Sequence, residues 1–292
     1  METDRYRVLA KVVELGSFSK AAAALGYTQS AISQSVASTE AALGFRLVVR
    51  DRGGVRLTPE GRAVFPSIES VVNAQRIVEE KASEVLGLER GTVRMGTIAS
   101  VSEHWLPAVI AEFQKKWPQV EFIIHQGDYD SIPEWIRTGK VDFGFVNPAS
   151  VSGLKTEPIA HGEMLAILPA SHRLADSEKV PLGELVGEPF ILLEEGGYYE
   201  PLEAFRAEGL EPDIRFTIHD DFTIMARVEQ GLGVSILAEL VMRKCPWEVV
   251  ARPCDPPVVR AIALAWRDDA SVPIASRRFM DAVLASRAGA DA

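Results

Sequence analysis

The sequence predicts an α/β chain with an N-terminal winged helix-turn-helix, a long linker helix and a C-terminal domain built on mostly parallel sheets. Three observations predict this fold class. Two helical segments meet at Gly26 with the spacing of a helix-turn-helix. A helical pattern of about 30 residues follows, and strands then alternate with helices toward the end of the chain. We place the three parts at residues 1–58, 59–88 and 89–292.

Size and composition are those of an ordinary soluble protein. The 292 residues suggest about two domains at roughly 150 residues each. Hydrophobic residues make up 47% and charged residues 25%, and no apolar run approaches the roughly 20 residues of a membrane helix. The N-terminal segment lacks the basic and apolar regions of a secretory signal. Only two cysteines are present, so no disulfide framework is expected and the cytoplasm is the expected location.

The net charge of −10 argues against nucleic-acid binding until its distribution is considered. Residues 1–65 carry nine Lys and Arg against six Asp and Glu, a balance of +3. The rest of the chain carries the other 22 of 31 basic and 35 of 41 acidic side chains, a balance of −13. The chain therefore joins a basic segment to an acidic body.

Three helices are expected in the basic segment. The spacing of apolar residues predicts them over 3–15, 18–25 and 28–43. Ser17 and Thr28 are suited to cap the second and third helices, and Gly26 suits the left-handed turn between them. Ala22 and Ile32 have the spacing at which a small residue fits under the crossing helix and an apolar one anchors the next helix.

The third helix carries polar residues near its start and off its apolar stripe. Gln can pair with adenine through two hydrogen bonds, and Ser can bond to base edges or phosphates. A small helical bundle with a solvated polar face would show similar residues, but the helix-turn-helix spacing favours DNA contact. The residues of this helix expected to contact DNA are Thr28, Gln29, Ser30, Ser33 and Gln34.

Two short extended stretches flank residues 51–54 and predict a hairpin-like wing. Arg50, Arg52 and Arg56 gather there, where they can bind phosphate or enter a minor groove. An arginine cluster alone is more often a solvated loop. Because this one lies beside a recognition helix, we interpret the three arginines as DNA contacts.

The order of these motifs is specific. It runs through Ser17-Phe18-Ser19-Lys20-Ala21-Ala22, Leu25, Thr28-Gln29-Ser30-Ala31-Ile32-Ser33, Glu40, Leu43-Gly44, Leu47, Arg50 and Leu57-Thr58-Pro59-Glu60-Gly61. On this pattern residues 2–65 resemble the winged helix-turn-helix of the LysR-type transcriptional regulators. Thr39 and Val48 depart from it, since that family usually has Leu and Phe at these positions. The resemblance implies a sequence-specific, DNA-binding transcriptional regulator.

The linker helix is expected over residues 59–88. Pro59 suits a first helical turn, whereas Pro66 predicts a kink or a slow start. A helix of ~30 residues spans about 45 Å, and its apolar stripe can pack on its own domain or pair with a second copy. The LysR resemblance implies antiparallel pairing in a homodimer or homotetramer. Two readers would then bind an interrupted inverted repeat in double-stranded DNA and act on RNA polymerase directly or indirectly.

The acidic body alternates between expected strands and helices, which predicts parallel sheets with crossovers. The alternating segments are 92–98, 101–117, 120–125, 131–138, 141–146, 163–168, 182–185, 190–193, 199–208, 214–218, 222–231, 234–237, 261–266 and 275–285. The LysR resemblance implies a two-lobed effector domain similar to periplasmic solute-binding proteins. It implies lobes at about 92–160 plus 267–292 and at 161–266.

The resemblance also implies that a small-molecule effector binds between the lobes, where strands end and backbone N–H groups are exposed. Serines there suit a carboxylate, but nearby acids would repel an anion unless they point away. Helix capping or solvation explains any single acid better than a ligand role does. Anionic, zwitterionic and cationic effectors therefore all stay open. The residues expected to contact the effector are Thr97, Ser100, Ser102, Asp128, Tyr129, Asn147, Glu195, Tyr198, Asp221 and Phe222.

Three alternatives compete with this interpretation. An enzyme has little support, because the five histidines are scattered and no nucleophile-elbow, P-loop or zinc-protease motif is present. A solute-binding protein would leave the basic segment unexplained. A thiol sensor would use Cys245 and Cys254, although buried or incidental thiols are the more common case. No metal or cofactor is expected.

Overall fold

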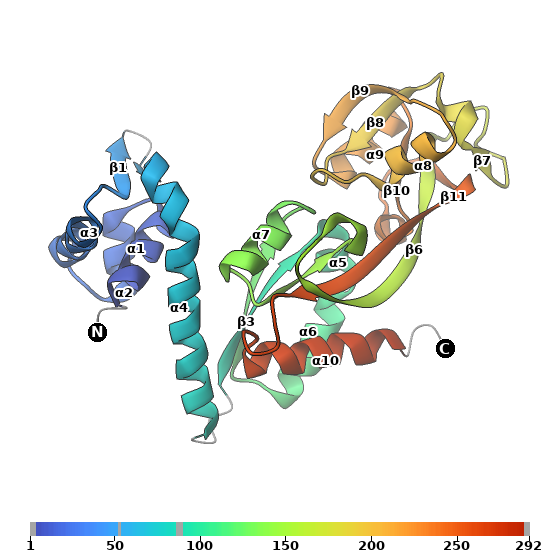
Figure 1. Ribbon diagram of the computed structural model, residues 1–292. Coiled ribbons are helices and arrows are strands. Elements are labelled where there is room, and N and C mark those ends of the chain that lie inside the picture. The colour runs from blue at the N-terminus through green and yellow to red at the C-terminus, as the bar shows by residue number, and fades with distance from the viewer. Residues whose placement is uncertain (1–3, 52–53, 86–89, 289–292) are drawn as a thin grey trace. The chain divides into compact units, whose positions relative to one another are not determined.

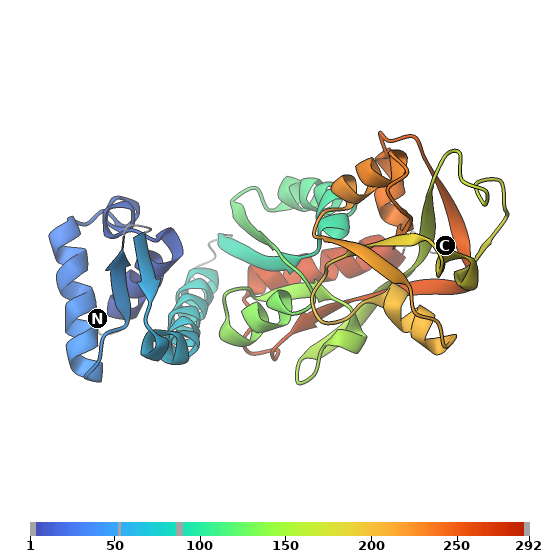
Figure 2. The ribbon, with the colours of Figure 1, turned by 90° about the horizontal axis from the view of Figure 1, so that it is seen from above.

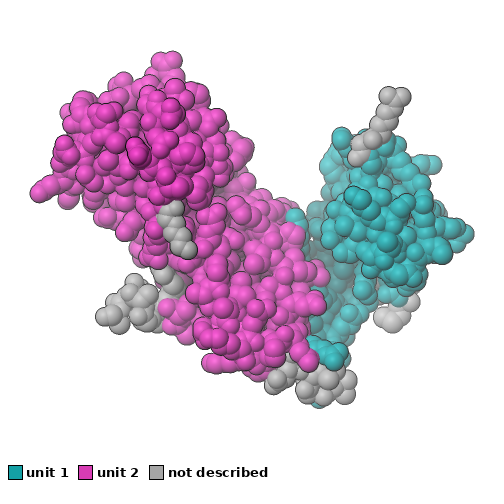
Figure 3. Space-filling view, turned by 180° about the vertical axis from the view of Figure 1, so that it is seen from behind, with its two compact units in different colours: residues 1–90, 137–141 teal, residues 91–136, 142–292 magenta. Residues whose placement is uncertain are grey.

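The computed structural model describes residues 4–51, 54–85 and 90–288 and forms two compact units (Figure 3). Unit 1 consists of residues 1–90 and 137–141, and unit 2 of residues 91–136 and 142–292. Among the residues described, no helix combines the length and the apolar content needed to span a bilayer.

Unit 1 begins with three helices, α1 (Asp4–Leu15), α2 (Phe18–Leu25) and α3 (Gln29–Leu43). The expected caps are confirmed. Ser17 Oγ accepts the N–H of Lys20, Thr28 Oγ1 accepts the N–H of Ala31, and Gly26 takes the left-handed conformation at φ 71°. One buried apolar cluster from all three helices forms the core of this bundle, with Leu9, Val12, Phe18, Ala21, Ala22, Ile32 and Val36 among its members.

The expected wing is confirmed as an antiparallel hairpin of β1 (Val48–Asp51) and β2 (Gly54–Leu57). A carboxylate fixes this hairpin to the recognition helix, because Glu40 Oε1 accepts the N–H groups of Leu47 and Val48 at 2.8 and 3.2 Å. The two departures from the family pattern are both accommodated. Val48 is buried in the core, and the hydroxyl of buried Thr39 donates to a carbonyl one turn back on its own helix.

Helix α4 (Pro59–Val85) starts at a tightly packed turn. The Thr58 hydroxyl donates to the carbonyl of Arg46 at 2.7 Å and accepts the N–H of Gly61 at 2.8 Å. A Cβ on Gly61 would lie 2.1 Å from the carbonyl oxygen of Leu47, so only glycine fits there. The helix continues through Pro66 as a single element, so the proline does not end it.

The first lobe of unit 2 is a parallel β-sheet with helices. Its strands are β3 (Gly91–Thr97), β4 (Val120–Gln126) and β5 (Phe143–Val146), with β3 between the other two. Its helices are α5 (Ala99–His104), α6 (Leu106–Lys116), α7 (Ser131–Thr138), the short 3₁₀ helix η1 (Pro148–Ser150) and the C-terminal α10 (Ile274–Ala288). Phe279 of α10 is fully buried against Phe113 and Phe122, which places the end of the described chain on this first lobe.

One predicted helix of this lobe is wrong in its length. The segment 101–117 was expected as one helix, but α5 ends at His104 and α6 begins at Leu106. Pro107 explains the break, because proline has no N–H for the preceding turn and fits only at the start of a helix.

The second lobe pairs β8 (Pro189–Leu193) in parallel with β9 (Asp213–Ile218), beside helices α8 (Glu200–Ala207) and α9 (Asp221–Glu229). Its remaining elements are β7 (Val180–Pro181), β10 (Ser235–Ala238) and the 3₁₀ helices η2 (Leu182–Leu185) and η3 (Glu239–Lys244). The predicted parallel pairing is confirmed for β3 with β4 and β5 in the first lobe and for β8 with β9 in the second.

Two long strands join the lobes. β6 (Lys155–Pro169) and β11 (Val249–Trp266) pair antiparallel along their length and run from one lobe to the other (Figures 1 and 2). Only 163–168 and 261–266 were expected to be extended. The register of β11 shifts between Pro253 and Val258, and the prolines there obscure the alternation that marks a strand.

Candidate functional site

In unit 1, the start of α3 presents a polar face. Gln29, Ser30 and Gln34 are exposed and Ser33 is half-buried, whereas the apolar residues of the helix, such as Ile32, are buried on the other side. Residues three or four positions apart lie on the same side of a helix, so Ser33 lies beside Gln29 and Ser30, and Gln34 lies beside Ser30. The amide and hydroxyl groups of these residues are of the kind that can bond to base edges in a major groove.

Intramolecular hydrogen bonds hold part of this face in place. Ser19 Oγ donates to Gln29 Oε1 at 3.0 Å, and Thr28 is engaged in capping the helix. Ser30 and Gln34 have no side-chain hydrogen bond to any residue that the structure describes, so both are free to bond to DNA. Of the five predicted residues, Thr28 therefore has a clear structural role, Gln29 and Ser33 accept hydrogen bonds from Ser19 and Arg50, and only Ser30 and Gln34 lack a side-chain partner among the described residues.

The wing arginines lie in different surroundings. The Arg50 guanidinium lies 3.7 Å above the Phe18 ring and donates to Ser33 Oγ at 2.9 Å, so it sits beside the polar face of α3. Arg56 is exposed and its Nε lies 3.6 Å from Asp51. Arg52 lies outside the described residues. Arg50 thus joins the wing to the recognition helix and keeps an exposed positive charge next to it.

In unit 2, five polar side chains from both lobes and a crossing strand meet in a buried network. Arg260 of β11 donates through Nε to the Tyr129 hydroxyl at 2.6 Å and through Nη2 to Glu195. Glu200 Oε1 accepts from the Tyr129 hydroxyl and from Asn147 Nδ2, both at 2.9 Å, and lies 3.6 Å from Arg260 Nε. The side chains of Arg260 and Glu200 are each only 3% exposed, so the network is buried where the two lobes meet the crossing strand.

The electrostatics of this network are unusual. Burial acts against the charge on Arg260, but the facing carboxylates outweigh it and raise its pKa further. Burial raises the pKa of Glu195, which Arg260 only partly offsets. Burial, together with repulsion from Glu195, raises the pKa of Asp221 from 3.8 to about 7. Such shifts are concentrated at functional sites, because a buried charge is retained at an energetic cost.

The other acids near the strand ends are occupied elsewhere. Asp128 Oδ1 accepts the N–H groups of Asp130 and Ser131 at the start of α7, and these bonds outweigh burial and lower its pKa. Asp220 caps α9 through the N–H of Thr223 at 2.7 Å. Glu194 is paired with the exposed His219 at 3.2 Å. Capping and solvent-facing pairs therefore account for these acids.

The remaining predicted effector residues differ in their burial and in their hydrogen bonds. Ser100 is buried at 3% exposure and Ser102 is half-buried, and neither hydroxyl has a hydrogen bond among the described residues. Thr97 instead donates to the carbonyl of Ile98, next to it in the chain. Tyr198 packs edge-on against Tyr129 with ring centroids 6.5 Å apart, whereas Phe222 is 37% exposed on α9.

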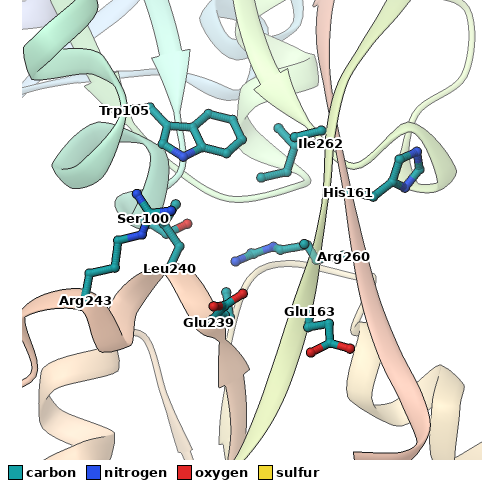
Figure 4. A pocket seen from close by; sticks show the side chains of 12 residues that line it. Ser100, Trp105, His161, Glu163, Glu239, Leu240, Arg243, Arg260 and Ile262 are labelled. Carbon is teal, nitrogen blue, oxygen red and sulfur yellow. The ribbon is translucent and has the colours of Figure 1, made fainter. Parts of the chain in front are cut away.

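A cavity of about 130 Å³ opens beside the network (Figure 4). Arg260 and Ile262 project into it from β11, and Trp105 closes it from the first lobe. Gly162, which pairs with Arg260 across the strands, faces open space, since a Cβ there would meet no atom within 4 Å. Ser100 also lines the cavity. The cavity is therefore bordered by the Arg260 guanidinium, the Ser100 hydroxyl and two apolar surfaces. Charged and polar side chains also line it, those of His161, Glu163, Glu239 and Arg243.

Sequence reasoning did not identify Arg260 or Glu200. A single charged residue at an inward position of an otherwise apolar strand, 258–266, was the available signal for Arg260. Glu200 had no comparable signal, because its partners Tyr129 and Asn147 lie 71 and 53 residues away in the sequence.

The two cysteines do not form a reactive pair. Both are free thiols. Burial raises the pKa of Cys254 to about 12, and its side chain is part of the apolar core of the second lobe. Cys245 packs against Met225, with their sulfur atoms 3.4 Å apart. A thiol with a raised pKa forms little thiolate, so these surroundings argue against a thiol sensor.

Two family models match the chain, one over each part that holds a candidate site. Residues 3–62 match the family described as "Bacterial regulatory helix-turn-helix protein, lysR family", and residues 86–288 match "LysR substrate binding domain". The chain is 32% identical over 285 residues to the HTH-type transcriptional regulator YvbU of Bacillus subtilis, covering 96% of this chain and 97% of that protein. It is 29% identical over 243 residues to the dual regulator GltC of the same organism, covering 82% and 81%.

Solved structures show the same fold along the whole chain. Full-length OxyR from Pseudomonas aeruginosa superposes with a TM-score of 0.71 at 23% identity, covering 98% of this chain and 97% of that one. CbnR, another LysR family regulator, also gives 0.71, at 20% identity and with 98% and 99% covered. Since the relatives are regulators, this chain acts through DNA and an effector domain and not as an enzyme. The chain belongs to the LysR family of DNA-binding transcriptional regulators.

Proposed function

We propose that the α3 face of each chain reads one half of an interrupted inverted repeat, and that a small molecule between the lobes of unit 2 controls this binding. The observation that carries the DNA half is the exposed polar face at the start of α3, opposite a buried apolar face. Gln29, Ser30, Ser33 and Gln34 would contact base edges, and Arg50 would contact a neighbouring phosphate. Such a regulator acts where the DNA is, which favours a cytoplasmic location.

The linker helix supports a symmetric assembly. Val71, Val78 and Val85 of α4 are 38%, 66% and 87% exposed and are spaced by seven residues. Apolar residues at this spacing form one stripe along a helix, as in the seam of a coiled coil. An exposed apolar stripe is best covered by a second copy of the same helix. Two copies would present two readers to DNA, and a tetramer would add a second pair.

The cleft of unit 2 supports effector control. Its network and cavity are built from both lobes and from the strands that join them, so a ligand there would change how the lobes are held. If the lobes have two arrangements, a ligand can shift the equilibrium between them only by the difference in its affinity for the two. We propose that the shift changes the spacing or bending of the bound DNA, and so the access of RNA polymerase to it.

The test starts from random DNA duplexes, selected by repeated binding to the purified full-length chain and sequenced. We expect enrichment of two similar arms in inverted orientation, separated by a spacer, and footprints that protect both arms. Enrichment of a single arm without symmetry, or no enrichment at all, would contradict the paired-reader proposal.

A further inference from the structure

The cleft of unit 2 holds an excess of buried negative charge. Arg260 is its buried cation, and three carboxylates lie around it, those of Glu195, Glu200 and Asp221. Glu200 is 4% and Asp221 is 9% exposed. Arg260 forms ion pairs with Glu195 and Glu200, which leaves Asp221 as a third acid for which the cluster offers no direct partner.

Two of these carboxylates have unused hydrogen-bonding capacity. Among the described residues, no donor lies within hydrogen-bond distance of Glu200 Oε2. Asp221, at the first position of α9, makes no side-chain hydrogen bond there either, because its neighbour Asp220 provides the cap. Buried polar atoms without partners are rare, since each costs about 1–3 kcal/mol, so Glu200 Oε2 indicates that the network can accept a further donor. The Asp221 oxygens are not fully enclosed, so a ligand can reach them.

The charges around Asp221 favour a positively charged donor beside its carboxylate. Glu195 and Glu103 raise its pKa from across the cleft and from α5, Asp220 raises it from its own helix, and Arg260 lowers it. Ser100 lies one turn before Glu103 on α5, and its hydroxyl has no partner among the described residues. A donor bound at Asp221 would therefore also face Glu195 and Glu103, whose carboxylates accept hydrogen bonds.

We propose that the effector presents a protonated amine to Asp221 and Glu195 in this cleft. The inference rests on the proposed effector role of the cleft and specifies the chemistry of the ligand. An ammonium group brings three donors and the positive charge that the cluster lacks. With it bound, two cations face three carboxylates. The adjoining cavity would hold the remainder of the molecule against Trp105 and Ile262.

Binding of an amine would be linked to protons. Without a cation beside it, Asp221 takes up a proton as the pH falls through about 7, and the protonated acid has no charge to attract an ammonium group. Affinity for an amine should therefore rise with pH through this range and level off above it. A carboxylate ligand would show the opposite dependence, because protonation of Asp221 removes a repelling charge.

The test uses three probes of similar size, n-propylammonium, 1-propanol and propionate, added to the full-length chain at equal ionic strength. Unfolding is followed by tryptophan fluorescence, since all five tryptophans lie in unit 2. At ten times its dissociation constant, a bound probe raises the folding equilibrium constant about tenfold. We expect this increase with n-propylammonium alone, larger at about pH 8 than at about pH 5.5.

Three variants decide the interpretation. Asp221→Asn should abolish the response to n-propylammonium, and Asp220→Asn, which keeps a capping side chain, should preserve it. Gly162→Val fills the adjoining cavity and should leave the small probe's response unchanged while blocking larger amines such as lysine and putrescine. No response to any of these amines, or a response that Asp221→Asn retains, would overturn the proposal.

A response to propionate alone would also overturn the amine assignment. If Gly162→Val loses the stabilisation by propionate, and propionate alters the DNA footprint of the wild type, the cleft is still an effector site and only the ligand class is wrong. If probes of neither class alter the footprint while the chain still selects an inverted repeat, the amine assignment is overturned together with effector control, and the DNA reader stands.

Discussion

Replacing Asp221 by Asn should stabilise unit 2 in a pH-dependent way. Burial raises the pKa of this carboxyl from 3.8 to about 7, and a tenfold change in proton affinity corresponds to about 1.4 kcal/mol. The ionised carboxylate therefore destabilises the folded unit by up to ~4 kcal/mol above about pH 7. The folded state retains its proton where the unfolded state has lost it, so stability falls as the pH rises from about 4 to about 7.

Asn cannot ionise, so the variant should lack this loss. We expect no difference from the wild type near pH 4 and a gain that approaches ~4 kcal/mol near pH 8. The assay is urea unfolding of the full-length chain at several pH values, followed by tryptophan fluorescence, which reports unit 2 alone. Asp220→Asn is the matched control and should keep the fall in stability between about pH 4 and about pH 7, since Asp221 is still present. A variant that is no more stable than the wild type at high pH, or a gain that does not vary with pH, would refute the reasoning.

Three further predictions concern unit 1. Val78→Asp buries a charge in the proposed helix seam and removes two valines per dimer, so the dissociation constant of the dimer, measured by sedimentation, should rise at least about 100-fold. An unchanged dissociation constant would disprove the seam. Gly61→Ala should destabilise the unit by about 1–3 kcal/mol in thermal unfolding, because its Cβ collides with a carbonyl, whereas Gly187→Ala meets no atom and should be neutral; equal effects would contradict the packing. Arg50→Ala should lower the slope of log affinity against log salt by about 1 in DNA titrations, and an unaltered slope would exclude a phosphate contact.

Local chemistry explains why the helix-turn-helix was predictable. Ser17, Thr28 and Gly26 determine where helices begin and end through contacts within a few residues. Such signals are readable in sequence because the interacting groups are neighbours along the chain. The helix expected over 101–117 was wrong although its signal was also local, because the apolar spacing was given more weight than Pro107.

The cleft was only partly predictable, because its contacts are long-range. The predicted Tyr129, Asn147 and Glu195 do meet there, as the strand-end rule expects. The side chain that joins Tyr129 and Glu195, Arg260, lies 131 residues from Tyr129 on a strand whose length was not apparent from the sequence. The charge of each acid was readable, but whether it caps a helix or faces the cleft depends on the fold. Only the structure separates Asp220, which caps, from Asp221, which does not.

DNA binding by the α3 face is tested most directly by one titration. A labelled duplex with the selected inverted repeat is titrated with wild type, with the double variant Gln29→Ala, Ser33→Ala, and with Ser38→Ala, which changes an exposed serine farther along the same helix. At about 1–3 kcal/mol for each lost base contact, the double variant should bind this duplex at least about tenfold more weakly and no better than random DNA. Ser38→Ala should bind as the wild type does. Unimpaired, sequence-specific binding by the double variant would contradict the assignment of α3 as the reader.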